Sequence, residues 1–240
     1  MRLLRDGALH FCLNLSDEQI SRFHTYYEAL RQWSKRFNLT SILEYDDVQI
    51  KHFLDSLSVY VTFPKQQDFP YLLIDIGSGG GFPGLPLKIA LPQLKVILLE
   101  SNHKKAVFLK HVIQMLEMED AEVLCARAEE VAHMADFREK FDLVVTRGLA
   151  KMATLCELTM PFCKKGGRLI AQKTMNIDSE LDQASKAITL MGGDKAQIVP
   201  IVVPGIEETR SLVVIEKVSN TPSKFPRRNG MPKSNPILTV

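Results

Sequence analysis

Apolar side chains recur at helical spacing near the start of the chain. Residues 20–37 carry apolar positions every three or four residues, which predicts one amphipathic helix. Ser16, with a glutamine three residues later, fits the capping box that begins such a helix. A second helix is predicted at about 46–61, and Pro64 would stop it. Two helices cannot bury their apolar faces alone, so we expect residues 1–65 to form a helical extension that packs on the rest of the chain.

From residue 71 the pattern changes to short apolar runs that alternate with helical stretches. Near-continuous apolar strands separated by helices are typical of a mostly parallel sheet covered on both faces. We therefore predict a doubly wound α/β domain over residues 66–217, with its ligand at the carboxyl ends of the strands. The strands are expected at residues 71–76, 96–100, 122–126, 142–146, 168–173, 196–203 and 212–217, and the helices between them at 85–91, 104–118, 154–162 and 178–191.

The distribution of charge singles out the C-terminal segment. The 240 residues carry 30 Lys and Arg against 28 Asp and Glu, a net charge of +2. Residues 218–240 form a proline-rich tail that holds cations, Arg227 and Arg228 among them, and no acid. Such a tail is expected to bind a polyanion, and its prolines favour a segment that orders only on binding.

Composition excludes several classes of protein. No apolar run is long enough for a transmembrane helix, and charges among the first residues make a secretory signal unexpected. The four cysteines have neither CxxC nor Cys/His spacing, so no metal site is expected. We therefore expect a cytoplasmic protein with reduced thiols, without a membrane or metal partner.

The strongest chemical signal is the segment DIGSGGGFPG at residues 75–84, between the first predicted strand and a helix. Gly77 and Gly79 begin a run of glycines that turns tightly and has no Cβ to block a bound molecule. Three of the glycines formally satisfy the dinucleotide motif GxGxxG. However, Pro83 and Pro86 fall in the first helical turn, where they remove N–H groups that a pyrophosphate needs. The loop therefore suits a nucleoside ligand without a pyrophosphate.

Residues after the later strands complete a candidate nucleoside site. Glu100 ends the second strand, where a carboxylate can accept hydrogen bonds from both ribose hydroxyls. Ala128 and Glu129 follow the third strand, where an adenine edge would lie, although the helix dipole equally favours an acid at a helix start. Arg147 follows the fourth strand, where donor and acceptor should meet. We expect it to anchor the cofactor or a nearby phosphate, the alternative being a salt bridge at a strand end.

Two further cations are candidate phosphate contacts. Lys173 ends the fifth strand and Arg210 precedes the last, and either is equally an ordinary surface cation. Together with Arg227 and Arg228, they make up the candidate polyanion-binding residues.

Five segments of the chain form a distinctive combination: DIGSGGGFPGLPLKIA, LLESNHKKAVFL, ARAEE, FDLVVTRGLA and KHFLDSL. Together they resemble a single family, the bacterial small-subunit ribosomal RNA methyltransferase G family, also called glucose-inhibited division protein B. The resemblance covers most of the chain, including NLTSI and the tail TPSKFPRRNGMPKSNPI. It implies a class I S-adenosylmethionine-dependent methyltransferase, with a Rossmann-like seven-stranded sheet whose last strand is antiparallel, and an N-terminal helical extension.

The resemblance also implies an activity. The family methylates N7 of a guanine in 16S rRNA near the decoding site, with S-adenosylmethionine as cofactor and 16S rRNA or the 30S subunit as partner. Glu100 occupies the family's acidic strand-end position, and Gly80 stands where some relatives carry proline. We expect a monomer. The family's cofactor contacts fall on Gly77, Phe82, Ala128, Glu129 and Arg147.

No catalytic side chain is expected for this reaction. Guanine N7 has an in-plane lone pair, so its attack on a methyl group needs no prior removal of a proton. The main contribution of the enzyme is then to hold N7, the methyl carbon and sulfur in line. Two alternatives stay open: a methyltransferase acting on protein or a small molecule, and a non-catalytic nucleotide-binding module. The glycine loop argues against the second alternative, because a site that had lost its catalytic function would tolerate side chains there.

Overall fold

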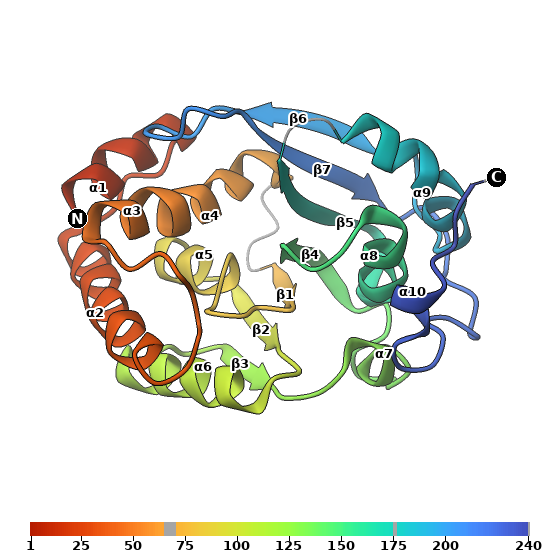
Figure 1. Ribbon diagram of the computed structural model, residues 1–240, viewed down its shortest axis with the longest axis horizontal. Coiled ribbons are helices and arrows are strands. Elements are labelled where there is room, and N and C mark those ends of the chain that lie inside the picture. The colour runs from red at the N-terminus through yellow and green to blue at the C-terminus, as the bar shows by residue number, and fades with distance from the viewer. Residues whose placement is uncertain (65–70, 175–176, 240) are drawn as a thin grey trace.

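The computed structural model of the chain describes residues 1–64, 71–174 and 177–239. Within them, seven strands form one sheet in the order β3-β2-β1-β4-β5-β7-β6 (Figure 1). The pairs among β1 to β5 are parallel, and β7 is antiparallel to both of its neighbours. The predicted α/β fold with its antiparallel last strand is confirmed. The strands are β1 (Leu72–Ile76), β2 (Lys95–Leu99), β3 (Ala121–Leu124), β4 (Phe141–Arg147), β5 (Cys163–Thr174), β6 (Gln197–Ile201) and β7 (Arg210–Glu216).

Helices cover both faces of this sheet, and none in the described part of the chain has the length and apolarity to cross a bilayer. The short helices α1, α7 and α10 lie where the sequence predicted none. The α-helices are α1 (Arg2–Ala8), α2 (Asp17–Ser34), α3 (Tyr45–Val48), α4 (Asp55–Leu57), α5 (Gly84–Ala90), α6 (His103–Met115), α7 (Ala128–Val131), α8 (Met152–Thr159), α9 (Asp178–Leu190) and α10 (Met231–Ser234). The 3₁₀ segments are η1 (Leu9–Phe11), η3 (Ser58–Thr62) and η4 (Met160–Phe162), and the π-helical segment is η2 (Gln49–Leu54).

Two hydrophobic cores lie on opposite faces of the sheet. Helices α1 to α6 pack on one face and α7 to α9 on the other, as Figure 1 shows. Along β1, Leu73 faces the first core, whereas Ile74 and Ile76 face the second. This division follows from the pleat of a strand, which sends successive side chains to opposite faces.

The N-terminal extension packs on the first core beside the glycine loop. The predicted capping box of α2 is confirmed, since Ser16 Oγ accepts from the Gln19 N–H at 3.2 Å and Gln19 Oε1 from the Ser16 N–H at 2.9 Å. Gln19 also donates to the Ile89 and Ala90 carbonyls, each at 2.9 Å, which ties α2 to α5. The predicted boundary between residues 65 and 66 lies outside the described residues.

The second predicted helix is a continuous helical run of changing pitch. It passes from α3 through the π-helical η2 and α4 to the 3₁₀ segment η3. A π-helical turn is wider than an α-helical one and is frequent at functional sites. Here His52, within η2, and Asp55, directly after it, are both buried polar side chains.

The C-terminal tail is packed against α7 and α8, so the expectation of a segment that orders only on binding is wrong. Arg138 Nη2 donates to the Thr221 carbonyl at 2.8 Å, and Arg138 Nη1 to the Phe225 carbonyl at 2.9 Å. The Arg227 guanidinium donates to both carboxylate oxygens of Glu157, at 2.8 and 2.7 Å, and that carboxylate is fully buried. Polar contacts with distant residues thus hold a tail whose own sequence has few apolar anchors.

Candidate cofactor and acceptor site

The glycine loop between β1 and α5 presents an open backbone surface. Gly77 and Gly79 adopt φ values of +74° and +60°, in the left-handed region that favours glycine. A Cβ built on Gly79 would meet only the Gly77 carbonyl oxygen, at 3.8 Å. The loop therefore leaves room for a ligand directly above Gly79, and any side chain there would project into that space.

The N-terminus of α5 offers no free donor for a phosphate. The Gly84 N–H donates to Asp75 Oδ2 at 2.9 Å. The N–H groups of Leu85 and Leu87 donate to carbonyls of the preceding loop, and Pro86 has no N–H. Because a pyrophosphate site depends on such N–H groups, this geometry supports the preference for a ligand without one.

Asp75 is a buried carboxyl beneath the loop, to which the sequence assigned no separate role. Burial raises its pKa to about 7, although the Gly84 N–H and the Arg147 charge oppose the shift. Its Oδ2 holds the first residue of α5, while Oδ1 has no hydrogen-bond partner among the described residues. Asp75 therefore fixes the path of the loop into the helix.

Glu100 joins the end of β2 to the glycine loop. Its Oε2 accepts from the Gly79 N–H at 2.8 Å and its Oε1 from the Asn102 N–H at 2.7 Å. A carboxylate has about four acceptor positions, so two stay available for ribose hydroxyls. The structure thus brings Glu100, which the sequence proposed for the ribose, into contact with Gly79 of the predicted cofactor loop.

Phe82 contacts both a histidine ring and a guanidinium, which also contact each other. The His52 ring stacks on it at 4.4 Å between centroids and 21° between planes, and the Arg147 guanidinium carbon lies 4.8 Å from its centroid. Cations over an aromatic face are attracted by the ring quadrupole. The predicted cofactor residues Phe82 and Arg147 therefore form one packed unit.

Arg147 is held from the N-terminal extension. Its Nη1 lies 3.1 Å from Asp55 Oδ2, and its Nη2 lies 3.1 Å from His52 Nδ1. The second nitrogen of that histidine, Nε2, lies 2.7 Å from Thr40 Oγ1. The Arg147 guanidinium only donates and requires Nδ1 to accept, whereas the Lys51 carbonyl, 3.2 Å from the same nitrogen, requires it to donate, so these two contacts belong to opposite tautomers of the neutral ring. The alternative interpretation of Arg147, a salt bridge at a strand end, is present, and its contact with a cofactor or a phosphate stays a prediction.

Sequence reasoning missed the roles of His52 and Asp55. The available signal was an acid within an apolar helical stripe, because a buried carboxylate normally requires a cation or donor nearby. Burial raises the pKa of Asp55, and the Arg147 charge counters the shift.

Two cations predicted to contact phosphate are engaged within the protein. Lys173 Nζ lies 2.7 Å from Glu180 Oε1 and donates to the Ala150 carbonyl at 2.7 Å. Arg210 Nε lies 3.7 Å from Asp55 Oδ1. Like Arg227, these side chains have carboxylate partners that the linear sequence did not reveal.

Ala128 and Glu129 begin α7, which follows the carboxyl end of β3. The Glu129 carboxylate is buried, and its Oε1 accepts from the Gly230 N–H at 3.0 Å. The tail therefore touches the residue predicted to lie at the adenine edge. Arg228, two residues before that glycine, is exposed.

Acidification is expected to destabilise the protein through His52. Burial and the Arg147 charge lower its pKa from 6.5 to about 3. Because the unfolded chain binds this proton more readily, stability should fall by about 1.4 kcal/mol per pH unit below pH 6.5. Urea denaturation of the parent and His52→Gln between about pH 4 and pH 7 checks this. The difference in unfolding free energy between the two should shrink as the pH falls, and a constant difference would refute the assignment.

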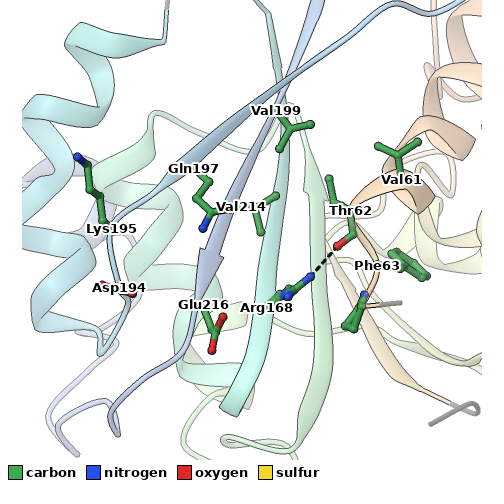
Figure 2. Close-up of a pocket in the computed structure, with 11 residues that line it drawn as sticks. Val61, Thr62, Phe63, Arg168, Asp194, Lys195, Gln197, Val199, Val214 and Glu216 are labelled. Carbon is green, nitrogen blue, oxygen red and sulfur yellow. Dashed lines mark hydrogen bonds between the residues drawn. The ribbon is translucent and has the colours of Figure 1, made fainter. Parts of the chain in front are cut away.

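A separate cavity of about 580 Å³ lies at the opposite edge of the sheet (Figure 2). Arg168, near the amino end of β5, borders it and donates to the Thr62 carbonyl at 3.1 Å. Its charged lining consists of two cations, Arg168 and Lys195, and two acids, Asp194 and Glu216. These balanced charges favour no ionic ligand, and the cavity is remote from the glycine loop.

Comparisons with known proteins agree with the sequence resemblance. The family described as rRNA small subunit methyltransferase G (GidB) matches residues 19–212. A protein of that name from Dehalococcoides mccartyi (strain CBDB1) is 46% identical over 226 residues, covering 94% of this chain and 95% of its own. One from Acetivibrio thermocellus is 41% identical over 236 residues, covering 98% and 96%.

Solved structures of low sequence identity share the fold. A protein of Agrobacterium tumefaciens described as a predicted O-methyltransferase has a TM-score of 0.54 at 21% identity, covering 70% of this chain and 81% of its own. A chain from the complex of the Haloferax volcanii Trm112 methyltransferase activator with a methyltransferase has a TM-score of 0.54 at 12% identity, covering 79% and 98%.

Proposed function

Because the chain belongs to the rRNA small subunit methyltransferase G family, we propose that it methylates N7 of one guanine in 16S rRNA near the decoding site. The methyl donor is S-adenosylmethionine. The substrate is the naked rRNA or the 30S particle. The enzyme acts as a monomer in the cytoplasm. The observation that carries the proposal is the open glycine loop, joined to Glu100, beside a helix start without free phosphate donors.

The residues present fit an adenosyl sulfonium. The space above Gly79 is free of side chains, and Glu100 retains acceptor capacity for the ribose hydroxyls. Ala128 and Glu129 would border the adenine, and Phe82 with Arg147 would border the methionine end. When bound, the cofactor supplies an electrophilic methyl group.

The side chains of this site position the substrate and do not transfer protons. His52 stays neutral, with Nδ1 near Arg147 and Nε2 near Thr40, so neither ring nitrogen is free to accept a proton from a substrate. Asp55 is engaged by Arg147. Guanine N7 needs no base, which matches a site in which His52 and Asp55 are already engaged. The chemical role left to the chain is alignment of the acceptor.

Methylation of defined substrates tests the proposal. The protein is incubated with labelled S-adenosylmethionine and unmethylated bacterial 30S subunits, naked 16S rRNA or total protein. We expect label in 16S rRNA, at a guanine that becomes sensitive to cleavage chemistry specific for N7-methylguanine. Label at another guanine atom would overturn the N7 assignment. Label on protein alone would replace RNA as the substrate class.

A further inference from the structure

Exposed cations gather where the end of α2 meets the start of α6. Trp33, in α2, packs on Phe108 and His111 of α6, with ring centroids 5.6 and 5.1 Å apart. Lys104 Nζ lies 5.6 Å from the Phe37 centroid. These contacts bring the turn after α2 onto the first turns of α6, and Figure 1 shows the two helices side by side.

Four of these cations form what we call the α2–α6 patch: Lys35, Arg36, Lys104 and Lys105. Three are exposed and Lys105 is half-exposed. No acid occurs in residues 29–43 or 101–116, and none of the four forms an ion pair within the described residues. Their charge is therefore unneutralised by the protein, unlike that of Lys173, Arg210 and Arg227.

The patch lies beside the proposed cofactor site. Helix α6 begins three residues after Glu100, whose carboxylate binds the Gly79 N–H. The turn that carries Lys35 and Arg36 continues to Thr40, which contacts His52 on the face of Phe82. One half of the patch thus lies a few residues along the chain from Glu100, which binds the glycine loop, and the other lies a few residues from Thr40, which reaches Phe82 through His52.

We propose that the α2–α6 patch binds the sugar–phosphate backbone of the substrate RNA next to the target guanine. Unpaired lysine and arginine side chains bind phosphate by releasing condensed counterions, which needs no base recognition. A basic surface beside the methyl-transfer site would orient the RNA, while methyl transfer takes place at the glycine loop. This inference rests on the proposed RNA substrate.

A matched pair of triple variants tests the patch. Lys35→Gln with Lys104→Gln and Lys105→Gln removes three patch lysines. Lys95→Gln with Lys165→Gln and Lys195→Gln removes three exposed lysines near the opposite edge of the sheet. Strands β2 and β5 begin at that edge, and the cavity bordered by Arg168 lies there. Both variants lose the same charge. Binding to unmethylated 30S subunits and to naked 16S rRNA is measured between about 50 and 200 mM salt.

The patch variant should bind RNA at least tenfold more weakly than the parent in low salt. The slope of log affinity against log salt should fall by about 0.7–0.9 for each lost contact. The control variant should keep the parent's slope. We expect the patch variant to have a raised KM for RNA and an unchanged kcat, because the glycine loop is intact.

Separate readouts distinguish a failed patch from a failed substrate assignment. The melting temperature and S-adenosylmethionine affinity should equal those of the parent, which establishes that the patch variant is folded. A patch variant with the parent's salt slope, or a control variant with an equal loss, would overturn the patch. If the parent itself neither binds nor methylates either RNA, the proposed RNA substrate fails instead.

Discussion

Substitution of Gly79 by asparagine is expected to weaken S-adenosylmethionine binding by on the order of 100-fold. Gly79 has a φ of +60°, which asparagine tolerates better than most side chains, so the loop should retain its path. The new side chain would extend into the open space above the loop, where the cofactor is expected to bind. Isothermal titration calorimetry with S-adenosylmethionine measures the loss, and methyl transfer should fall in parallel.

Gly166 provides the matched control for this variant. It has a φ of +82°, and a Cβ built there meets nothing within 4 Å, but it lies near the start of β5 at the other end of the sheet. Gly166→Asn should therefore carry a similar backbone cost and leave cofactor affinity unchanged. Equal losses of affinity in the two variants would mean that the space above Gly79 is not the ligand site.

The pattern of apolar and polar residues predicted the sheet well, because each strand is marked by a run of consecutive apolar residues. Each apolar run between residues 71 and 217 became a strand with a boundary error of a few residues, and the glycine loop followed β1 as expected. The four-residue helix α7 escaped detection because it is too short for a helical period. The π-helical η2 was equally invisible, since its apolar stripe differs little from that of an α-helix.

The candidate site was only partly predictable, for a different reason. Residues that follow the carboxyl ends of parallel strands meet at one edge of the sheet, which placed Gly79 and Glu100 together. In the structure the two residues share a hydrogen bond. Charge partners follow no such rule, because they join residues distant in sequence. Arg210 near Asp55 shows this, because a cation at the start of a strand gives no sign whether its partner is a phosphate or a buried carboxylate.

Replacement of Arg227 is expected to have the largest effect on stability. Its guanidinium donates two hydrogen bonds to Glu157, a carboxylate with no exposed surface. Breaking a buried pair by removing one partner leaves an uncompensated charge and costs about 3–5 kcal/mol. Arg227→Met should therefore lower the unfolding free energy by that amount, measured by chemical denaturation. The sequence-based interpretation of Arg227 as an RNA contact predicts no such loss.

Two companion variants decide between these interpretations of the tail. Arg228→Met alters the exposed neighbour, so its unfolding free energy should stay within about 0.5 kcal/mol of the parent value. Adding Glu157→Gln to Arg227→Met removes the stranded charge and retains an acceptor for the backbone N–H of residue 227, which now donates to Glu157 at 2.9 Å. This double variant should recover at least half of the lost stability. If Arg227→Met matches Arg228→Met in stability and only RNA binding declines, the tail is an RNA arm and the ion pair contributes little to folding.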